Sequence, residues 1–396
     1  MNNILTSFDS EKCCGCGSCI QTCPTHALSY ANDSYGFIVP RIEESKCVNC
    51  GKCIRSCPYN NLASYNAKPM VYAAVSLNDE LQLKSSSGGI MGEMAISVLR
   101  EGGVVFGCEM TDDFSVRHTY VSTFDELPRI QRSKYLQSYQ GQSYAQVKKF
   151  LADGRKVLYT GTPCIIAGLK SYLGKMAGHD NLITIDVVCH GVPSQAFFND
   201  YLSFLSRQMK KPIQTYTFRA KRKIRNGMEW NVAYATLHGK QTFRNWPEDS
   251  YNYYYMKGAT YRDSCYKCPF ASSVRYSDVT LCDYWHWEES SLHFNKDDSV
   301  SGIVLNTAKG AELFENIKGR IRFEQSTFED LSLHNSCLRT PTPQHPQREY
   351  LLDLWKKEGY GQLDKYFRKK YGFQIAKYRL LRHVPKSIIH YIHNHI

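Results

Sequence analysis

Two cysteine runs near the N-terminus constrain this 396-residue chain more than any other feature. Both runs follow the pattern C-x2-C-x2-C-x3-C-P. This is the spacing of bacterial ferredoxins that hold two [4Fe–4S] clusters. The first run contains Cys13, Cys16, Cys19 and Cys23, and the second contains Cys47, Cys50, Cys53 and Cys57.

The spacing also predicts which cysteines share a cluster. Three thiolates two residues apart wrap a loop around one cluster, whereas the fourth points toward the other cluster. We therefore assign one set to Cys13, Cys16, Cys19 and Cys57, and the other to Cys47, Cys50, Cys53 and Cys23. Zinc is the alternative metal, but zinc sites usually combine two C-x2-C pairs. Cys14 is surplus to the pattern and is interpreted as a spare thiol.

Length and hydropathy narrow the class of protein. The chain is long enough for two or three domains. The N-terminal residues contain no cationic segment leading into an apolar run, so we expect no signal peptide. No stretch approaches the roughly 18 apolar residues of a membrane-spanning helix. We therefore expect a cytoplasmic protein, in which the sixteen cysteines are metal ligands or redox groups rather than disulfides.

The net charge is concentrated at one end of the chain. The sequence has 49 Lys and Arg against 37 Asp and Glu, a net charge of +12. Eight of the cations and no acids lie between Lys365 and Ile396, which leaves +4 of the +12 for everything before them. The body is thus only mildly basic and shows no recognition motif, so we expect no nucleic-acid partner.

The remainder of the chain predicts a larger domain. After the polar segment Asn60–Pro69, apolar strands alternate with amphipathic helices, which indicates an α/β core with some parallel strands. The segment from Thr215 to Lys240 alternates around "RNG" and predicts an antiparallel hairpin. The expected fold class is α+β / α/β. We expect a small 2[4Fe–4S] ferredoxin domain at 1–66, a mixed α/β domain at 67–345 and a basic, aromatic-rich helical extension at 346–396.

Four cysteines in the larger domain predict a third metal site. Cys164 and Cys189 each follow a predicted strand, at the carboxyl edge where ligands bind in parallel sheets. Cys265 and Cys268 form a C-x2-C pair that lacks two ligands. Together the four predict a third [4Fe–4S] cluster. Zinc is the alternative for four thiolates, and Cys282 could replace one of them.

Three further features suggest chemistry near this site. The turn "KSSSGG" opens onto a helix, where free N–H groups and the helix dipole favour an anion such as a flavin diphosphate; a simple serine N-cap is the alternative. Arg219 and Lys221 would share one side of a strand and face a phosphate, or else form a solvated basic face. His190, beside Cys189, is either a proton donor or a loop-orienting residue.

Together these motifs resemble the beta subunit family of coenzyme F420 hydrogenases and dehydrogenases. The shared motifs are "SSGG" at 86–89, "GTPC" at 161–164, "CHGVPS" at 189–194, "FRAK" at 218–221, "CYKCPFASSVRYSDVTLCDYW" at 265–285 and "SGIVLNTAKG" at 301–310. The resemblance implies an FAD beside a [4Fe–4S] cluster, and it is strongest to bacterial chains found with polysaccharide-synthesis enzymes. Two features depart from the family pattern. Cys282 stands where the family usually has a glycine, just before the aspartate of "DYW", and the basic C-terminal extension is not part of the shared pattern.

The resemblance implies an iron–sulfur flavoprotein oxidoreductase. Clusters pass single electrons, most organic substrates accept two, and a flavin can do both. We expect electrons from a ferredoxin- or flavodoxin-type donor to reach FAD and reduce an organic substrate in polysaccharide biosynthesis. A non-catalytic electron-transfer subunit serving a partner enzyme is the alternative, and a zinc-containing structural module is a third. The residues expected to hold the FAD are Ser86, Ser87, Gly88, Gly89, Thr162, Arg219 and Lys221.

The C-terminal tail needs its own interpretation. It mixes Tyr, Phe, Ile and Leu with cations, a composition typical of an interfacial helix on an anionic membrane, where each cation contributes about 1 kcal/mol. Peripheral membrane contact would suit a lipid-linked sugar substrate. The alternative is a helix that covers the protein's own core.

Overall fold

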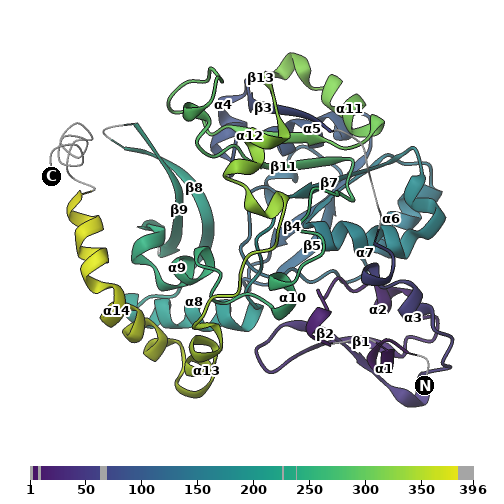
Figure 1. The fold of residues 1–396 in the computed structure, drawn as a ribbon, viewed down its shortest axis with the longest axis horizontal. Coiled ribbons are helices and arrows are strands. Elements are labelled where there is room, and N and C mark those ends of the chain that lie inside the picture. The colour runs from purple at the N-terminus through teal and green to yellow at the C-terminus, as the bar shows by residue number, and fades with distance from the viewer. Residues whose placement is uncertain (1–2, 8–9, 63–68, 225–226, 238, 382–396) are drawn as a thin grey trace.

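The computed structural model describes the whole chain except residues 1–2, 8–9, 63–68, 225–226, 238 and 382–396. A small N-terminal head lies against a larger mixed α/β domain, beside α6 (Ser143–Ala152), α7 (Pro163–Leu173) and α10 (Asp263–Tyr266) (Figure 1). This arrangement confirms the predicted fold class.

The head is one hairpin and three short helices. Strands β1 (Leu28–Asn32) and β2 (Ile38–Ile42) pair antiparallel. The helices are α1 (Ile4–Ser7), α2 (Ser18–Thr22) and α3 (Lys52–Arg55). Gly17 and Gly51 precede α2 and α3 with φ of 76° and 67°. Because this left-handed conformation favours glycine, each cysteine run can turn sharply from loop into helix at the same place.

An eight-stranded mixed sheet forms the centre of the larger domain. Its order is β13-β3-β12-β11-β7-β6-β4-β5, and the pairs β11–β7, β7–β6 and β6–β4 are parallel. The strands are β3 (Met70–Ser76), β4 (Val104–Met110), β5 (Val116–Val121), β6 (Val157–Gly161), β7 (Leu182–Val187), β11 (Val279–Asp283), β12 (Ser301–Leu305) and β13 (Ile321–Ser326). The parallel centre aligns the carboxyl ends of β6, β7 and β11 at one edge.

Helices cover both faces of this sheet. On one face α6 and α7 pack on Val157 and Tyr159; on the other, α5 (Ile90–Arg100) and α11 (Ala308–Glu315) pack near Leu158. Val157, Leu158 and Tyr159 are all fully buried. Such continuous burial is typical of parallel strands covered on both sides. Two shorter helices of this domain are α4 (Asp79–Leu83) and α12 (Phe328–Leu333).

A second, three-stranded antiparallel sheet stands beside the first (Figure 1). It comprises β8 (Thr215–Ile224), β9 (Gly227–Leu237) and β10 (Lys240–Arg244). The predicted hairpin is β8–β9, and the tip of its turn falls outside the described residues. Its core is aromatic and is shared with α8 (Gln195–Met209), α9 (Ser250–Met256), α13 (Arg348–Glu358) and α14 (Tyr360–Leu381).

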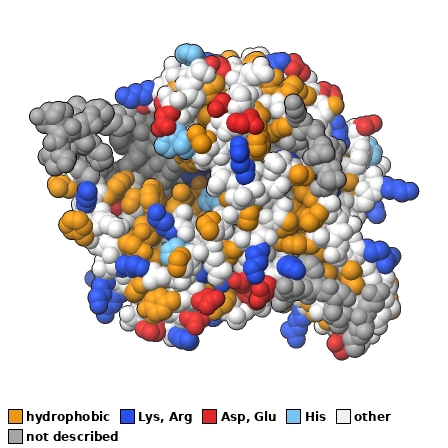
Figure 2. Space-filling model, viewed as in Figure 1, with side chains coloured by type: hydrophobic (Ala, Val, Ile, Leu, Met, Phe, Trp, Pro, Cys, Tyr) orange, Lys and Arg blue, Asp and Glu red, His pale blue; other side chains and the backbone are white. Residues whose placement is uncertain are grey.

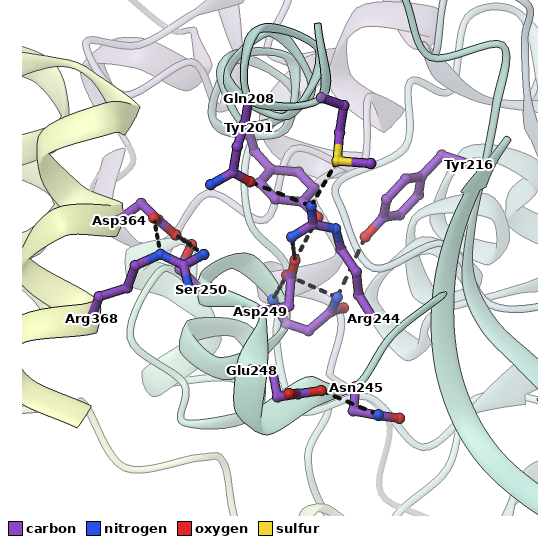
Figure 3. A network of polar contacts seen from close by, with 12 residues as sticks. Tyr201, Gln208, Tyr216, Arg244, Asn245, Glu248, Asp249, Ser250, Asp364 and Arg368 are labelled. Carbon is purple, nitrogen blue, oxygen red and sulfur yellow. Dashed lines mark hydrogen bonds and ion pairs between the residues drawn. The ribbon is translucent and has the colours of Figure 1, made fainter. Parts of the chain in front are cut away.

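The first half of α14 covers the protein's own core. Leu363 and Phe367 are fully buried in the aromatic cluster. Figure 3 shows the polar network beside them: Asp364 accepts from Ser250 Oγ at 2.8 Å and from Arg368 Nε at 2.6 Å. The self-covering interpretation therefore holds for this half. Farther along α14, Phe373 is 83% exposed.

A neighbouring part of the network fixes α9. Asp249, at the N-cap of α9, accepts from Tyr201 at 2.7 Å and pairs with Arg244 at 3.7 Å (Figure 3). The carboxylate is buried, so these partners offset its loss of water. Among the described residues, we find no helix with the length and apolar character needed to span a bilayer.

Candidate iron–sulfur centres

The first cysteine group surrounds a cavity inside the head. The cavity measures about 250 Å³, and Ile4, Ile20 and Pro58 form part of its apolar wall. Its cysteines include Cys13, Cys16, Cys19 and Cys57. Cys57 comes from the second run, so the structure crosses the two runs as the spacing predicts. Cys14 lines the cavity as well, and the four cysteines of the spacing pattern are the donor set that a [4Fe–4S] cluster requires.

The second group lies toward the surface of the head. One pocket is lined by Cys23, Cys47, Cys50 and Cys53. Cys50 is exposed, and the neighbouring Val48 is 64% exposed. We call this the outer group, and the set around the buried cavity the inner group.

The third group forms where segments distant in the sequence meet. Cys164 lies in the first turn of α7, Cys189 follows β7, and Cys265 and Cys268 lie in and after α10. The Cys189 sulfur is within electrostatic range of the other three. Burial, followed by repulsion between neighbouring sulfurs, raises the pKa of Cys265 and of Cys268 to about 12. These thiols therefore ionise only when a metal centre compensates their charge.

The spacing within this group bears on the identity of the metal. Across the described part of the chain, no three His, Cys, Asp or Glu side chains approach closely enough to hold one metal ion. A tetrahedral zinc site needs all its sulfurs about 2.3 Å from a single ion. The described residues therefore contain no preassembled mononuclear zinc site.

A buried ion pair supports the third group. Arg275 Nη2 lies 2.6 Å from Asp186 Oδ1, and both side chains are almost fully buried. Asp186 is near the end of β7, three residues before Cys189. Arg275 Nη1 also donates to the carbonyl of Phe270 at 3.2 Å, two residues after Cys268. The pair therefore ties the two loops that carry cysteines to each other.

Cys14 lies between the inner and third groups. Hydrogen bonding with Cys16 raises the pKa of Cys14 well above its ordinary value, although hydrogen bonding with Cys164 opposes this. Hydrogen bonding with Cys14, followed by burial, raises the pKa of Cys164. The cysteine pattern contains no signal for this contact, since the contact depends on how the head docks.

The other cysteines lie elsewhere. Cys282 Sγ is 3.9 Å from the Gly302 carbonyl, in an apolar cluster with Leu331. Cys337 Sγ contacts Thr342 Oγ1 at 3.5 Å. Cys108 lies on β4, where burial raises its pKa. The structure therefore does not place Cys282 among the four cysteines of the third group.

The Ser86–Gly89 turn is held together by internal hydrogen bonds. Gly88 N donates to Ser301 Oγ at 2.9 Å, and Ser87 Oγ donates to the Val300 carbonyl at 3.1 Å. Ser86 Oγ accepts from Ser133 N at 2.9 Å. The Ser87 hydroxyl and the Gly88 amide therefore already donate to partners within the protein.

The positive N-terminal end of α5, the helix that follows this turn, already has an acidic side chain beside it. Glu93, in the first turn of α5, is 2% exposed. It accepts from Ser76 Oγ at 2.5 Å and from Arg320 Nε at 2.9 Å. A carboxylate already stands at the positive end of the helix dipole.

The two predicted phosphate-binding cations have partners within the protein. Arg219 donates twice to Asp283, both at 2.6 Å. Burial alone would lower the pKa of Arg219, but the pair with Asp283 outweighs burial and raises it. Lys221 Nζ donates to the carbonyls of Gln82 and Ser87 at 2.8 and 2.6 Å. Burial lowers the pKa of Lys221 to about 7. Lys221 therefore braces the turn, whereas Asp283 on β11 holds Arg219.

Thr162 and His190 both adjoin the third group. Thr162 Oγ1 lies 3.3 Å from Cys164 Sγ. His190 Nδ1 is 2.6 Å from the Tyr261 hydroxyl, which itself donates to the Tyr255 carbonyl. Burial lowers the pKa of His190 to about 4, so the ring is neutral at pH 7. This geometry favours the loop-orienting interpretation of His190.

Comparisons with known proteins find family models in both the head and the larger domain. Residues 154–330 match the family model for the C terminus of the coenzyme F420 hydrogenase/dehydrogenase beta subunit. Two models of a 4Fe-4S dicluster domain match residues 12–61 and 39–101. No curated protein matches the sequence.

One similar solved structure is a xenon derivative of the F420-reducing [NiFe] hydrogenase complex from Methanosarcina barkeri. The similarity covers 78% of this chain and 95% of that chain, at 15% identity and a TM-score of 0.45. With the family matches and the cysteine groups in view, the chain is an iron–sulfur electron-transfer protein that is related, over residues 154–330, to the coenzyme F420 hydrogenase/dehydrogenase beta subunit.

Proposed function

We propose that the chain is an oxidoreductase that carries single electrons through three [4Fe–4S] clusters. Inner and outer clusters would be held by the eight cysteines of the head, and a third by Cys164, Cys189, Cys265 and Cys268. The observation that carries the proposal is the Tyr144 hydroxyl, which donates to the carbonyl of Cys16 at 2.9 Å and to that of Ile165, next to Cys164, at 3.1 Å, because this bridge makes the inner and third groups neighbours.

Burial supports an order for the relay. The outer group includes the exposed Cys50, whereas Cys16, Cys19 and Cys57 of the inner group are buried. Electrons would enter at the outer group, cross the inner group and reach the third. A ferredoxin- or flavodoxin-type donor would dock over Val48 and Cys50. Charges of both signs are interspersed on the face in Figure 2, so this proposal rests on the exposed cysteine loop and not on a charged patch.

FAD is the proposed final acceptor within the chain. When bound, a flavin accepts electrons singly and delivers them in pairs. The proposal rests on this chemical need and on the family match, since Ser87, Gly88, Arg219 and Lys221 already hydrogen-bond with other groups of the protein. It therefore leaves the location of FAD in the fold unassigned.

Anaerobic purification with quantitation of iron, acid-labile sulfide and flavin tests the function. We expect about twelve iron and twelve sulfide per chain, four of each per cubane, with one flavin. About eight iron would contradict the third cluster. Bound zinc without sulfide would contradict the relay altogether, and full clusters without flavin would contradict only the FAD proposal.

The second candidate function is a non-catalytic subunit that passes electrons to a partner enzyme. The internally bonded Ser86–Gly89 turn favours it, since no flavin site is apparent there. The chain alone, reduced by dithionite, should then reduce a one-electron acceptor such as a viologen of higher potential, and no organic substrate. Turnover of any sugar or lipid-linked sugar by the isolated chain would exclude this candidate.

Peripheral membrane contact through α14 is proposed on a narrower basis. Phe373 and Leu380 are 83% and 71% exposed, and Lys369 and Lys377 are exposed on the same helix. Apolar side chains among cations suit an anionic lipid surface, which would suit a lipid-linked substrate in polysaccharide synthesis. Co-sedimentation with anionic vesicles tests the contact; no binding at low salt would contradict it.

A further inference from the structure

The contact between the head and the larger domain is a tight seam. On α7, a Cβ added at Gly168 would lie 2.8 Å from Cys16 Cβ. Gly15 has φ of +68°, and a Cβ there would lie 2.3 Å from Gln137 Nε2 and 3.1 Å from Arg262 Nη1, both of the larger domain. The loop of the first cysteine run therefore packs directly on these two side chains.

Arg262 contacts three cysteine-bearing segments at this seam. Its Nε donates to the carbonyl of Cys13, in the run that surrounds the inner cavity. Its backbone N donates to the Val192 carbonyl at 3.1 Å, three residues after Cys189. Its own carbonyl accepts from Cys265 N at 3.0 Å. One residue therefore joins a loop of the inner group to two loops of the third group.

The guanidinium of Arg262 is buried, but it has no acidic partner among the described residues. It is 4% exposed, and its hydrogen bonds go to neutral oxygens, those of Cys13, Ile38 and Gln137. The other buried arginines of the described chain each pair with a carboxylate: Arg219 with Asp283, Arg275 with Asp186 and Arg348 with Asp263. Burying a cation is unfavourable unless a negative charge lies nearby.

The two neighbouring cysteine groups suit such a cation. Four thiolates give a [4Fe–4S] centre a net negative charge, and reduction adds one more electron. Arg262 is hydrogen-bonded to Cys13 through its side chain and to Cys265 through its backbone, and these cysteines belong to different groups. A positive charge in this position stabilises the reduced form of each centre, because reduction makes the centre more negative.

We propose that Arg262 is a positioning residue for electron transfer: it provides a buried positive charge beside the inner and third clusters and holds their loops together at the seam. The inference rests on the proposed function. One electron passes from the inner to the third cluster with no bond formed or broken, and dithionite is the reductant in the test. Arg262 itself is neither a ligand nor a redox group.

Three variants of the full chain test this role, with a fourth as control. Arg262→Gln removes the charge, Arg262→Lys keeps it, and Gln137→Glu places a carboxylate beside an unmodified Arg262. Gln137 suits this change because its Oε1 lies 3.4 Å from Arg262 Nη1, whereas its Nε2 is buried with no hydrogen-bond partner among the described residues. Arg129→Gln is the matched control, since Arg129 is 41% exposed and pairs with Glu109 on β4.

Each protein is purified anaerobically for iron and sulfide quantitation, EPR-monitored redox titration and freeze-quench measurement of electron arrival at the third cluster. We expect Arg262→Gln and Gln137→Glu to keep the iron and sulfide of the unmodified protein and to lower the potentials of the inner and third clusters. In Arg262→Gln, transfer should also slow by about tenfold, the lower end of what loss of an outer partner costs a metal site. Arg262→Lys should largely restore the potentials, and Arg129→Gln should match the unmodified protein.

Potentials in Arg262→Gln equal to those of the unmodified protein would overturn the inference. An equal fall in Arg262→Lys and Arg262→Gln would overturn the role of the charge. If Arg262→Gln does not fold, unchanged potentials in Gln137→Glu decide against the inference instead. A failure of the proposed function is distinguishable, because it appears already in the unmodified protein as about eight iron instead of twelve.

Discussion

The head and the third cysteine group solve the same chemical problem in different ways. The head draws its eight cysteines from two runs with fixed spacing, and glycines in the left-handed conformation turn each run into a helix. The third group draws its cysteines from three loops, brought together because β6 and β7 are parallel neighbours and the Arg275–Asp186 pair ties in the α10 loop. Local cysteine spacing therefore specifies the sites of the head, whereas the topology of the sheet specifies the third group.

The difference extends to stability. The described core of the head is small and consists largely of Ile4, Ile20, Leu28 and the cysteines themselves. Metal binding in such a domain supplies much of its folding free energy. The third group instead adjoins a sheet that is buried on both faces, and we expect this sheet to fold without help from the metal. Removing ligands from the two places should therefore have unequal structural consequences.

The largest expected effect separates the two sites directly. Cys57→Ala should remove the inner cluster and unfold much of the head, whereas Cys268→Ala should remove only the third cluster. Each variant should lose about four iron, but only Cys57→Ala should gain rapid proteolytic cleavage within residues 1–62. Equal protease resistance of the two heads would contradict the comparison.

The next largest effect is expected from breaking the buried ion pair that supports the third group. Arg275→Met leaves Asp186 buried without its partner, which should lower the free energy of unfolding by about 3–5 kcal/mol. Urea unfolding of the larger domain measures this. Lys156→Met, which breaks a partly exposed pair with Glu101, should cost about 0–1 kcal/mol. Similar losses in both variants would contradict the role given to the buried pair.

A smaller effect probes the seam between the two regions. Gly168→Ala places a Cβ against Cys16, and such overpacking should cost about 1–3 kcal/mol. Gly178→Ala is the control, since nothing lies within 4 Å of its added Cβ. The thermal unfolding temperatures of the two variants test this prediction. If Gly168→Ala is as stable as Gly178→Ala, the contact between α7 and the head is looser than the structure shows.

The smallest expected stability change concerns α14. Phe373→Ser should alter unfolding free energy by no more than about 0.5 kcal/mol, because the ring is 83% exposed. Phe367→Ala, at a fully buried site on the same helix, should cost about 3–5 kcal/mol. If α14 touches a membrane, Phe373→Ser should also weaken co-sedimentation with anionic vesicles. Binding equal to that of the unmodified chain would contradict that contact.

Much of the fold and part of the site could be predicted from sequence. The position of Cys57 beside Cys13 follows from spacing, and the meeting of Cys164 with Cys189 follows from the rule for parallel strands. The pairing of Arg219 with Asp283 could not be predicted, because the partners lie on different sheets and no local pattern joins them. The bonds within the Ser86–Gly89 turn escaped prediction for the same reason: they come from Ser133 and from β12.

The sequence alone determined the number and local grouping of the head cysteines, since residues a few positions apart have few conformations to choose from. It also determined the alternation of strands and helices, because hydrophobic periodicity specifies which faces are buried. Tertiary structure alone decided which cations form internal ion pairs. It also brought Cys14 close to Cys164. Those contacts form between surfaces that are distant in the sequence. Their formation depends on the shape and charge of the folded surfaces, which a short stretch of sequence does not reveal.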